Sequence, residues 1–206
     1  MKLYTYDPAP NPQRLANFLK YKGIEIETHQ VDMMSGEQLG EDYAAINPDK
    51  TLPALVLDDG TVLAEVIGQC MYLESIYPDK PLLGTNDLER AQVISWDHKL
   101  YLSVFMGVAE VLRNGHPNFA GRALPGPLDV EQIPALVDRG RMRLEYGWEM
   151  LDKAVTGRTW LAGDHFSMAD IDVAVLHGFS GWVKATPPEE LENLHAYLGR
   201  VQAELG

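Results

Sequence analysis

The stretch Thr51–Val66, TLPALVLDDGTVLAEV, contains two short apolar runs joined by an Asp-Asp-Gly turn. Asp59-Gly60 favours a tight β-hairpin, because glycine adopts the positive φ that such turns require. Pro53 cannot donate a hydrogen bond to a sheet, so we expect it at the first residue of its strand. A helix is predicted to begin near Glu65, where the first N–H groups have no partner within the helix. We therefore expect this hairpin to form a docking edge for a peptide-like ligand.

The residues before the hairpin predict two strands and two helices. Lys2–Tyr6 and Ile24–Val31 are predicted strands. Asn11-Pro12 predicts a helix N-cap followed by proline at the first helical position, and Gly23 is typical of a helix end. Ser35–Gln38 resembles a capping box that opens a short second helix.

A helix is also predicted after the hairpin, over Val66–Tyr77. The order strand–helix–strand–helix–strand–strand–helix predicts a small α/β domain with one right-handed parallel crossover and an antiparallel edge. Pro78–Gly84 contains two prolines and a glycine, as linkers often do. Every later segment predicts helix. We expect an α/β domain over residues 1–80, a linker over 81–87 and an all-helical domain over 88–206.

Four helices are predicted in the second part of the chain. They cover Asp87–Arg113 with Asn86 as N-cap, Val130–Val155, a segment opened by the capping box Ser167-x-x-Asp170, and Glu189–Glu204. A loop rich in glycine and proline, Asn114–Leu128, separates the first two.

Composition excludes several classes of function. The net charge of −13 over 206 residues argues against nucleic acid or an anionic membrane as partner, because both need a basic surface. No apolar run reaches membrane-spanning length, and the N-terminus lacks the pattern of a signal peptide. The single cysteine, Cys70, excludes an intrachain disulfide and is expected in the core. These features predict a soluble cytoplasmic protein without a metal site.

The order of elements, Leu52-Pro53, the hairpin, Glu65 and the segment Gly163–Asp170 together resemble the cytosolic glutathione transferase family. The resemblance covers nearly the whole chain. Ala9–Glu27 is similar to bacterial and fungal members that lack a conventional catalytic Tyr, Ser or Cys. The resemblance implies a thioredoxin-like domain that holds glutathione, a helical domain with the second-substrate pocket, a homodimer, and a role in detoxification. Glutathione would be a co-substrate, with no other cofactor.

The resemblance also implies glutathione contacts on the first domain. Glu65 would pair the γ-glutamyl ammonium through a charge-assisted hydrogen bond, or it only favours the helix N-terminus, which is worth about 0.3–1 kcal/mol. Leu52, just before Pro53, would offer its backbone N–H and C=O to the cysteinyl part. Lys50 would hold the glycyl carboxylate, with Gln38 as a weaker candidate; the alternative for Lys50 is a solvated surface side chain.

Val66 departs from the family pattern. Most members have Ser there, whose hydroxyl binds the γ-glutamyl carboxylate. Val66 offers only its backbone N–H, although a helix N-terminus still favours an anion. A missing hydrogen bond to a charged group is worth about 1.5–3 kcal/mol, so we expect weaker glutathione binding than the family pattern provides.

The thiol of glutathione has a pKa near 8.5, and lowering it by about two units requires almost 3 kcal/mol. Asn11 is the best candidate to donate to the sulfur; the alternative is that it serves only as an N-cap. Tyr6 is a fallback within its strand, and Asp7 would oppose a thiolate. The resemblance makes His116 a second catalytic candidate that would hold an activating water, against the alternative of a solvated loop residue.

The second substrate would meet the helical domain. The residues expected to face it are Ser103, Phe105, Met106, Leu112 and Phe119. The leading hypothesis is conjugation of the glutathione thiolate to a small apolar electrophile. Two alternatives stay open: glutathione-dependent disulfide reduction, and a non-catalytic binding module with the same fold.

Overall fold

The structure, a computed structural model, describes residues 1–206 and divides into two units. One unit consists of Met1–Lys80 together with Leu124–Asp129, and the other of Pro81–Ala123 with Val130–Gly206. Six residues of the loop before the longest helix thus belong with the N-terminal unit. No helix is both long enough and apolar enough to cross a membrane.

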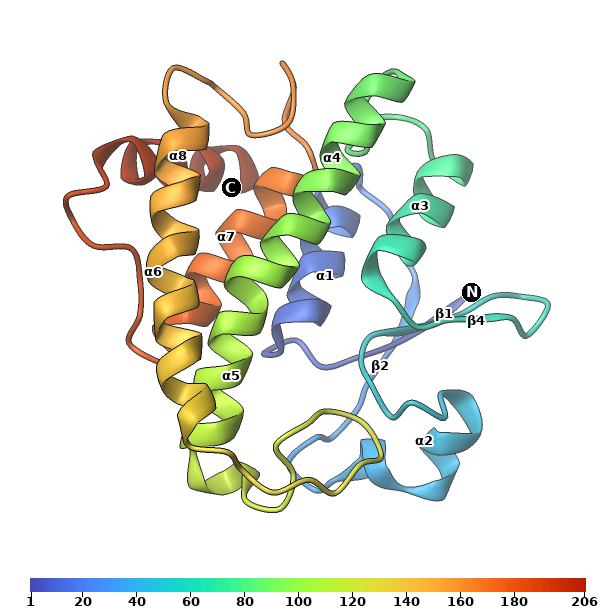
Figure 1. The fold of residues 1–206 in the computed structure, drawn as a ribbon. Helices are drawn as coiled ribbons and strands as arrows, with labels where there is room; N and C mark the ends of the chain where they lie inside the picture. Colours follow the sequence, from blue (N-terminus) through green and yellow to red (C-terminus); the bar gives the residue numbers. More distant parts are fainter. The chain divides into compact units, whose positions relative to one another are not determined.

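A four-stranded sheet forms the centre of the first unit (Figure 1). Its strands are β1 (Lys2–Thr5), β2 (Glu27–Gln30), β3 (Ala54–Val56) and β4 (Val62–Leu63), in the order β2-β1-β3-β4. β1 pairs with β2 in parallel, and β3 pairs antiparallel with both β1 and β4. The predicted hairpin, the parallel strand pair and the antiparallel edge are confirmed.

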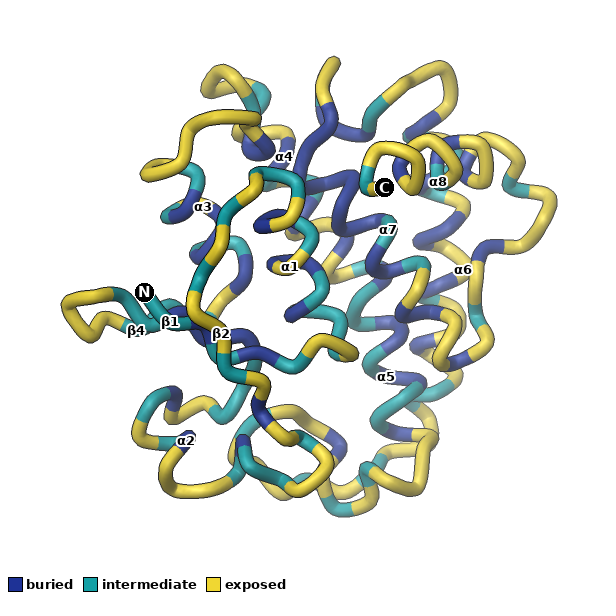
Figure 2. The backbone as a smooth tube through the Cα atoms, turned by 180° about the vertical axis from the view of Figure 1, so that it is seen from behind, coloured by how far each residue is buried: buried dark blue, intermediate teal, exposed yellow.

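The hairpin turn has the expected chemistry. Gly60 has a φ of +87°, and Asp59 Oδ1 accepts a hydrogen bond of 2.9 Å from the N–H of Thr61. This bond holds the pKa of the Asp59 carboxyl below its usual range. The tip itself is exposed (Figure 2). The turn therefore fixes the register of β3 and β4 without being buried.

Three α-helices accompany the sheet: α1 (Pro10–Lys22), α2 (Glu41–Ile46), which follows the 3₁₀ turn η1 (Glu37–Leu39), and α3 (Val66–Ile76). α1 and α3 pack against one another. Their shared core contains fully buried apolar side chains, among them Leu15, Phe18, Cys70 and Leu73. The expected core position of Cys70 is confirmed.

Two predicted helix starts are wrong. Ala9 is the N-cap of α1 and Pro10 its first residue, so Asn11 lies inside the first turn and caps nothing. Proline at Pro10 suits this position because its missing N–H would have no helical partner anyway. Ser35 does not cap a helix either: its Oγ donates to the C=O of Asp32, and Gly36, with a φ of +81°, precedes η1.

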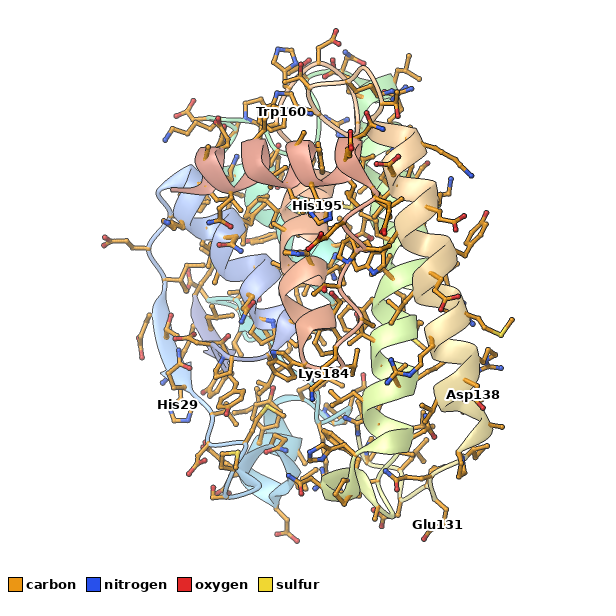
Figure 3. The ribbon with its side chains drawn as sticks, turned by 90° about the vertical axis from the view of Figure 1, so that its left-hand side faces the viewer. His29, Glu131, Asp138, Trp160, Lys184 and His195 are labelled. Atoms are coloured by element: carbon orange, nitrogen blue, oxygen red, sulfur yellow. The ribbon has the colours of Figure 1, made fainter.

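The second unit is entirely helical. Its long first helix runs as α4 (Asp87–Leu100), a π-helical turn η2 (Tyr101–Phe105) and α5 (Met106–Gly115). The turn η3 (Pro117–Phe119), α6 (Ala135–Val155), α7 (Met168–Gly181) and α8 (Glu192–Leu205) follow. Asn86 caps α4 as predicted, accepting 3.0 Å from the N–H of Glu89. α6 starts five residues later than predicted, after Pro134; Asp138 lies in its first turns (Figure 3).

Glycines let α5 and α6 lie side by side (Figure 1). A Cβ on Gly140 would lie 2.7 Å from the carbonyl oxygen of Gly107. Next to this contact, Arg139 and Arg143 of α6 pair with the buried Glu110 of α5. Arg143 also donates 2.8 Å to the carbonyl of Leu102 in the π-helical turn. Close backbone approach and these charged bonds together fix the two helices.

Candidate functional site

Side chains of α2 and the residue after it hold the loop before β3, while the backbone N–H and C=O of Leu52 in this loop stay free. Tyr43 Oη and Asn47 Nδ2 both donate to the carbonyl of Thr51, at 2.6 and 2.9 Å. Burial raises the pKa of Tyr43 to about 12, so its hydroxyl stays protonated and able to donate at neutral pH. The Leu52-Pro53 peptide bond is cis. No hydrogen bond within the chain uses the N–H or C=O of Leu52, so both are available to a ligand.

The start of α3 presents an acidic side chain and free N–H groups. Glu65 is the N-cap residue, with φ −104° and ψ 131°, and it is exposed. No ion pair within the chain involves its carboxylate. Val66 follows as the first helical residue, with its side chain buried. The N–H groups at this end have no helical partner, which favours an anion beside them.

The side chain of Lys50 reaches the end of η1, the turn that also contains Gln38. Lys50 Nζ donates 2.8 Å to the carbonyl of Leu39, the residue after Gln38. The backbone of Lys50 is left-handed, with φ +53°, a conformation uncommon for a side chain with a Cβ. Gln38 is buried, and its Oε1 has no partner.

Asn11 lies in the first turn of α1, and its amide is oriented by a charged neighbour. Arg14 Nη1 donates 3.1 Å to Asn11 Oδ1, which fixes the oxygen and leaves the amide NH₂ as a donor. Arg14 is itself buried. Asp7, which would oppose a thiolate, accepts 2.8 Å from Gln30 Nε2 on β2. The carbonyl of Tyr6 accepts from the N–H of Ala9.

His116 lies at the C-terminal end of α5, in the helical unit. It is exposed, its Nδ1 accepts 3.3 Å from the N–H of Asn118, and its ring meets Phe119 edge-on at 6.3 Å between centroids. Gln132 Nε2 donates to its carbonyl at 2.8 Å. These contacts give His116 a role in shaping the loop after α5.

The expected second-substrate residues follow one continuous helical stretch and the loop after it. Phe105 stacks on Tyr101 with centroids 4.9 Å apart and also meets Phe179 at 5.5 Å. Ser103 Oγ donates back to the carbonyl of Lys99. Met106 and Leu112 are half-buried. The guanidinium of Arg113 covers the ring of Phe119 at 4.6 Å. The π-helical turn thus brings Phe105 into an aromatic row that the sequence did not indicate.

Comparison with known proteins decides the family. Residues 9–76 match the model of the glutathione S-transferase N-terminal domain, and residues 131–204 match that of the C-terminal domain. A solved glutathione S-transferase domain-containing protein from Marinobacter aquaeolei VT8 is 30% identical over the full length of both chains, with a TM-score of 0.88. This chain belongs to the glutathione S-transferase family.

Two curated members of the family match almost the whole chain. Glutathione S-transferase 2 of Saccharomyces cerevisiae is 28% identical over 98% of this chain and 85% of its own length. The GstA protein of Escherichia coli O157:H7 is 29% identical over 98% of this chain and 92% of its own. The resemblance in the sequence is thereby confirmed, together with the thioredoxin-like and all-helical halves of the glutathione S-transferase fold.

Gln69 is a residue of the transferase site region that sequence reasoning missed. It lies on α3 with no exposed surface and donates through Nε2 to the carbonyls of Pro53 and Leu63. A signal was present in the sequence, since an amide stands among Val66, Cys70 and Leu73 on the apolar face of a predicted helix. Buried polar groups need hydrogen-bond partners, so such a residue marks a specific contact.

Proposed function

We propose that this glutathione S-transferase conjugates the thiolate of glutathione to small apolar electrophiles. The observation that carries the proposal is the free backbone of Leu52 on the same hairpin that leads to Glu65 and the start of α3. This arrangement offers main-chain hydrogen bonds for a peptide, a carboxylate for an ammonium group, and helix N–H groups for a carboxylate. Glutathione carries all three complementary groups.

In this proposal Leu52 pairs with the cysteinyl part of glutathione and Pro53 shapes the loop. Glu65 pairs with the γ-glutamyl ammonium, and the N–H of Val66 meets the γ-glutamyl carboxylate. Lys50 holds the glycyl carboxylate, and Gln38, which is buried, is the weaker candidate for the same carboxylate. Lys50 already has the Leu39 carbonyl as a partner at 2.8 Å, so its ammonium is held in place for a further bond. The absent hydroxyl at Val66 makes the γ-glutamyl end the weaker one.

Asn11 is the proposed group that stabilises the thiolate. Its amide oxygen is occupied by Arg14, so its NH₂ is the part able to donate to sulfur. The N-terminus of α1 adds a favourable field for an anion. His116, through a bound water, is the second catalytic proposal. Ser103, Phe105, Met106, Leu112 and Phe119 are proposed to face the electrophile.

Conjugation of chlorodinitrobenzene to glutathione, followed by absorbance, tests the proposed reaction. We expect a rate above the uncatalysed one, saturable in glutathione. Turnover of a small mixed disulfide without conjugation would replace the proposal with disulfide reduction. Glutathione binding without either reaction would replace it with a non-catalytic binding module, and the absence of both binding and turnover would reject all three.

Replacing Asn11 tests the thiolate role separately. Asn11→Ala is expected to move the pH dependence of kcat/KM about one unit toward higher pH. A lost hydrogen bond of about 1.4 kcal/mol raises the pKa of the bound thiol by about one unit. The control is Gln13→Ala, which removes the neighbouring bond from Gln13 Nε2 to the Pro8 carbonyl. We expect this control to leave the profile in place; an unchanged profile in Asn11→Ala would remove Asn11 from the mechanism.

The proposal also includes a homodimer that works in the cytoplasm in detoxification. An apolar surface supports the dimer. Met142 and Tyr146 are 69% and 65% exposed and lie four residues apart on α6, hence on one face. Leu102 is also exposed, and its carbonyl accepts a hydrogen bond from Arg143, which lies on α6 between Met142 and Tyr146. Sedimentation equilibrium is expected to give twice the mass of the chain, and a monomer at all concentrations would reject the dimer.

A further inference from the structure

Gln69, on α3, connects the residue before β3 with β4. Its Nε2 donates 3.0 Å to the carbonyl of Pro53, next to Leu52, and 2.7 Å to the carbonyl of Leu63, two residues before Glu65. These bonds bridge 16 and 6 residues of sequence. Together with the pairing of β3 and β4, one amide thus connects the loop before β3 and the segment that leads into α3.

The orientation of this amide is fixed by its surroundings. Both contacts of Nε2 are carbonyl oxygens, which accept only, so the nitrogen must face them. Gln69 Oε1 is buried without a hydrogen-bond partner. An unpaired buried acceptor is unfavourable, and an apolar residue on this helix face would avoid it. The two donated bonds are therefore what distinguishes this amide from an apolar side chain of the same size.

We propose that Gln69 is a positioning residue that sets the spacing between the backbone of Leu52 and the γ-glutamyl contacts at Glu65 and Val66. This inference rests on the proposed function, since glutathione is the ligand that bridges the two points. Gln69 touches neither the ligand nor the reacting sulfur; it acts through the Pro53 and Leu63 carbonyls. Gln69 affects the binding of glutathione before the reaction, and only for ligands that contact both Leu52 and the start of α3.

The position of Gln69 separates this role from ordinary packing. Leu73 lies one helical turn further along α3 and is also fully buried, but it bonds to neither carbonyl. Loss of packing at Leu73 lowers stability without changing the spacing of the two contact points. Loss of the Gln69 amide frees both carbonyls and leaves only the β3–β4 pairing between the two segments, so the loop and the helix start are expected to move apart.

Gln69→Met keeps the length of the side chain and removes both donors. We expect the KM for glutathione to rise about tenfold, with kcat at saturating glutathione and the KM for chlorodinitrobenzene unchanged. Leu73→Val is the matched control, which is expected to lower the melting temperature without changing the KM for glutathione. Gln69→Asn, with a shorter amide, serves if Gln69→Met does not fold, and it is expected to raise the same KM.

A truncated ligand separates positioning from a purely structural role, because a structural defect would weaken the binding of both ligands. The dipeptide Cys-Gly lacks the γ-glutamyl group and engages only the Leu52 side. In titrations followed by NMR, Gln69→Met is expected to weaken glutathione binding while leaving Cys-Gly binding unchanged. Equal weakening of both ligands, or loss of stability with an unchanged KM, would overturn the positioning role. A wild-type protein that neither binds nor conjugates glutathione would instead reject the proposed function.

Discussion

Asp170→Ala is expected to lower the free energy of unfolding by about 3–5 kcal/mol, because it orphans several buried donors at once. Asp170 has no exposed surface. Its Oδ1 accepts from the N–H of Leu161 and from Tyr197 Oη, and its Oδ2 accepts from the N–H and Oγ of Ser167. Each of these donors would lose its partner in a place that water does not reach easily.

Asp170 also gives this prediction a pH dependence. Burial raises the pKa of the Asp170 carboxyl, although hydrogen bonds from Tyr197, Leu161 and Ser167 act in the opposite direction. The folded state therefore binds the proton more tightly than the unfolded state does. The contribution of Asp170 to stability is greatest below the ordinary pKa of Asp and falls as pH rises through that value to the raised one.

Urea unfolding of the wild type and Asp170→Ala from acidic to neutral pH measures both effects. The difference in unfolding free energy is expected to shrink as pH rises while remaining large at neutral pH. The control is Asp164→Ala, an exposed carboxylate in the same segment, with an expected effect within about 0.5 kcal/mol. An effect of Asp170→Ala no larger than this control would contradict the role of Asp170 as a buried acceptor for three segments.

Lys22→Met is expected to cost about 3–5 kcal/mol, the cost of breaking a buried ion pair by removing one partner. The side chain of Lys22 has no exposed surface. Its Nζ lies 2.6 Å from Glu74 Oε2 and donates to the carbonyls of Asp79 and Lys80 at 2.7 and 3.1 Å. One ammonium thus ties the end of α1 to the end of α3 and to the chain leaving the N-terminal unit.

A double-mutant cycle separates the ion pair from the carbonyl contacts. Lys22→Met combined with Glu74→Met is expected to cost less than the sum of the two single substitutions, because each single substitution already breaks the same ion pair. Lys153→Met is the control for loss of an exposed lysine in the last turn of a helix. Additive effects of the two substitutions, measured by urea unfolding, would show that the pair contributes no coupling.

Features set by local chemistry were predictable from the sequence. The Asp59-Gly60 turn, the Asn86 cap and the Ser167–Asp170 capping box each depend on residues a few positions apart, and all three are confirmed. The capping box expected at Ser35 has the same sequence pattern and is wrong. There, Ser35 Oγ donates to the carbonyl of Asp32, and Asp32 Oδ1 accepts from the N–H groups of Met34 and Ser35, so a different local arrangement takes the place of the cap.

In the candidate site, too, some features were predictable from the sequence and others were not. The placement of Leu52, Glu65 and Val66 along one hairpin was predictable, because all three belong to one short stretch of sequence. The orientation of Asn11 by Arg14 and the bridge made by Gln69 were not, since each depends on side-chain directions that periodicity does not give. The π-helical turn at Tyr101–Phe105 also escaped prediction, because its freed Leu102 carbonyl is satisfied by Arg143, about forty residues along the chain.

Glutathione is expected to bind the hairpin with its γ-glutamyl end on Glu65. Calorimetric titration of the wild type and Glu65→Gln with glutathione and with Cys-Gly measures this contact, with Glu41→Gln as control for an exposed acid in a first helical turn. We expect the wild type to bind glutathione at least about tenfold more tightly than Cys-Gly, and Glu65→Gln to lose most of that difference. Equal binding of the two ligands by the wild type, or no binding of glutathione at millimolar concentration, would contradict the claim.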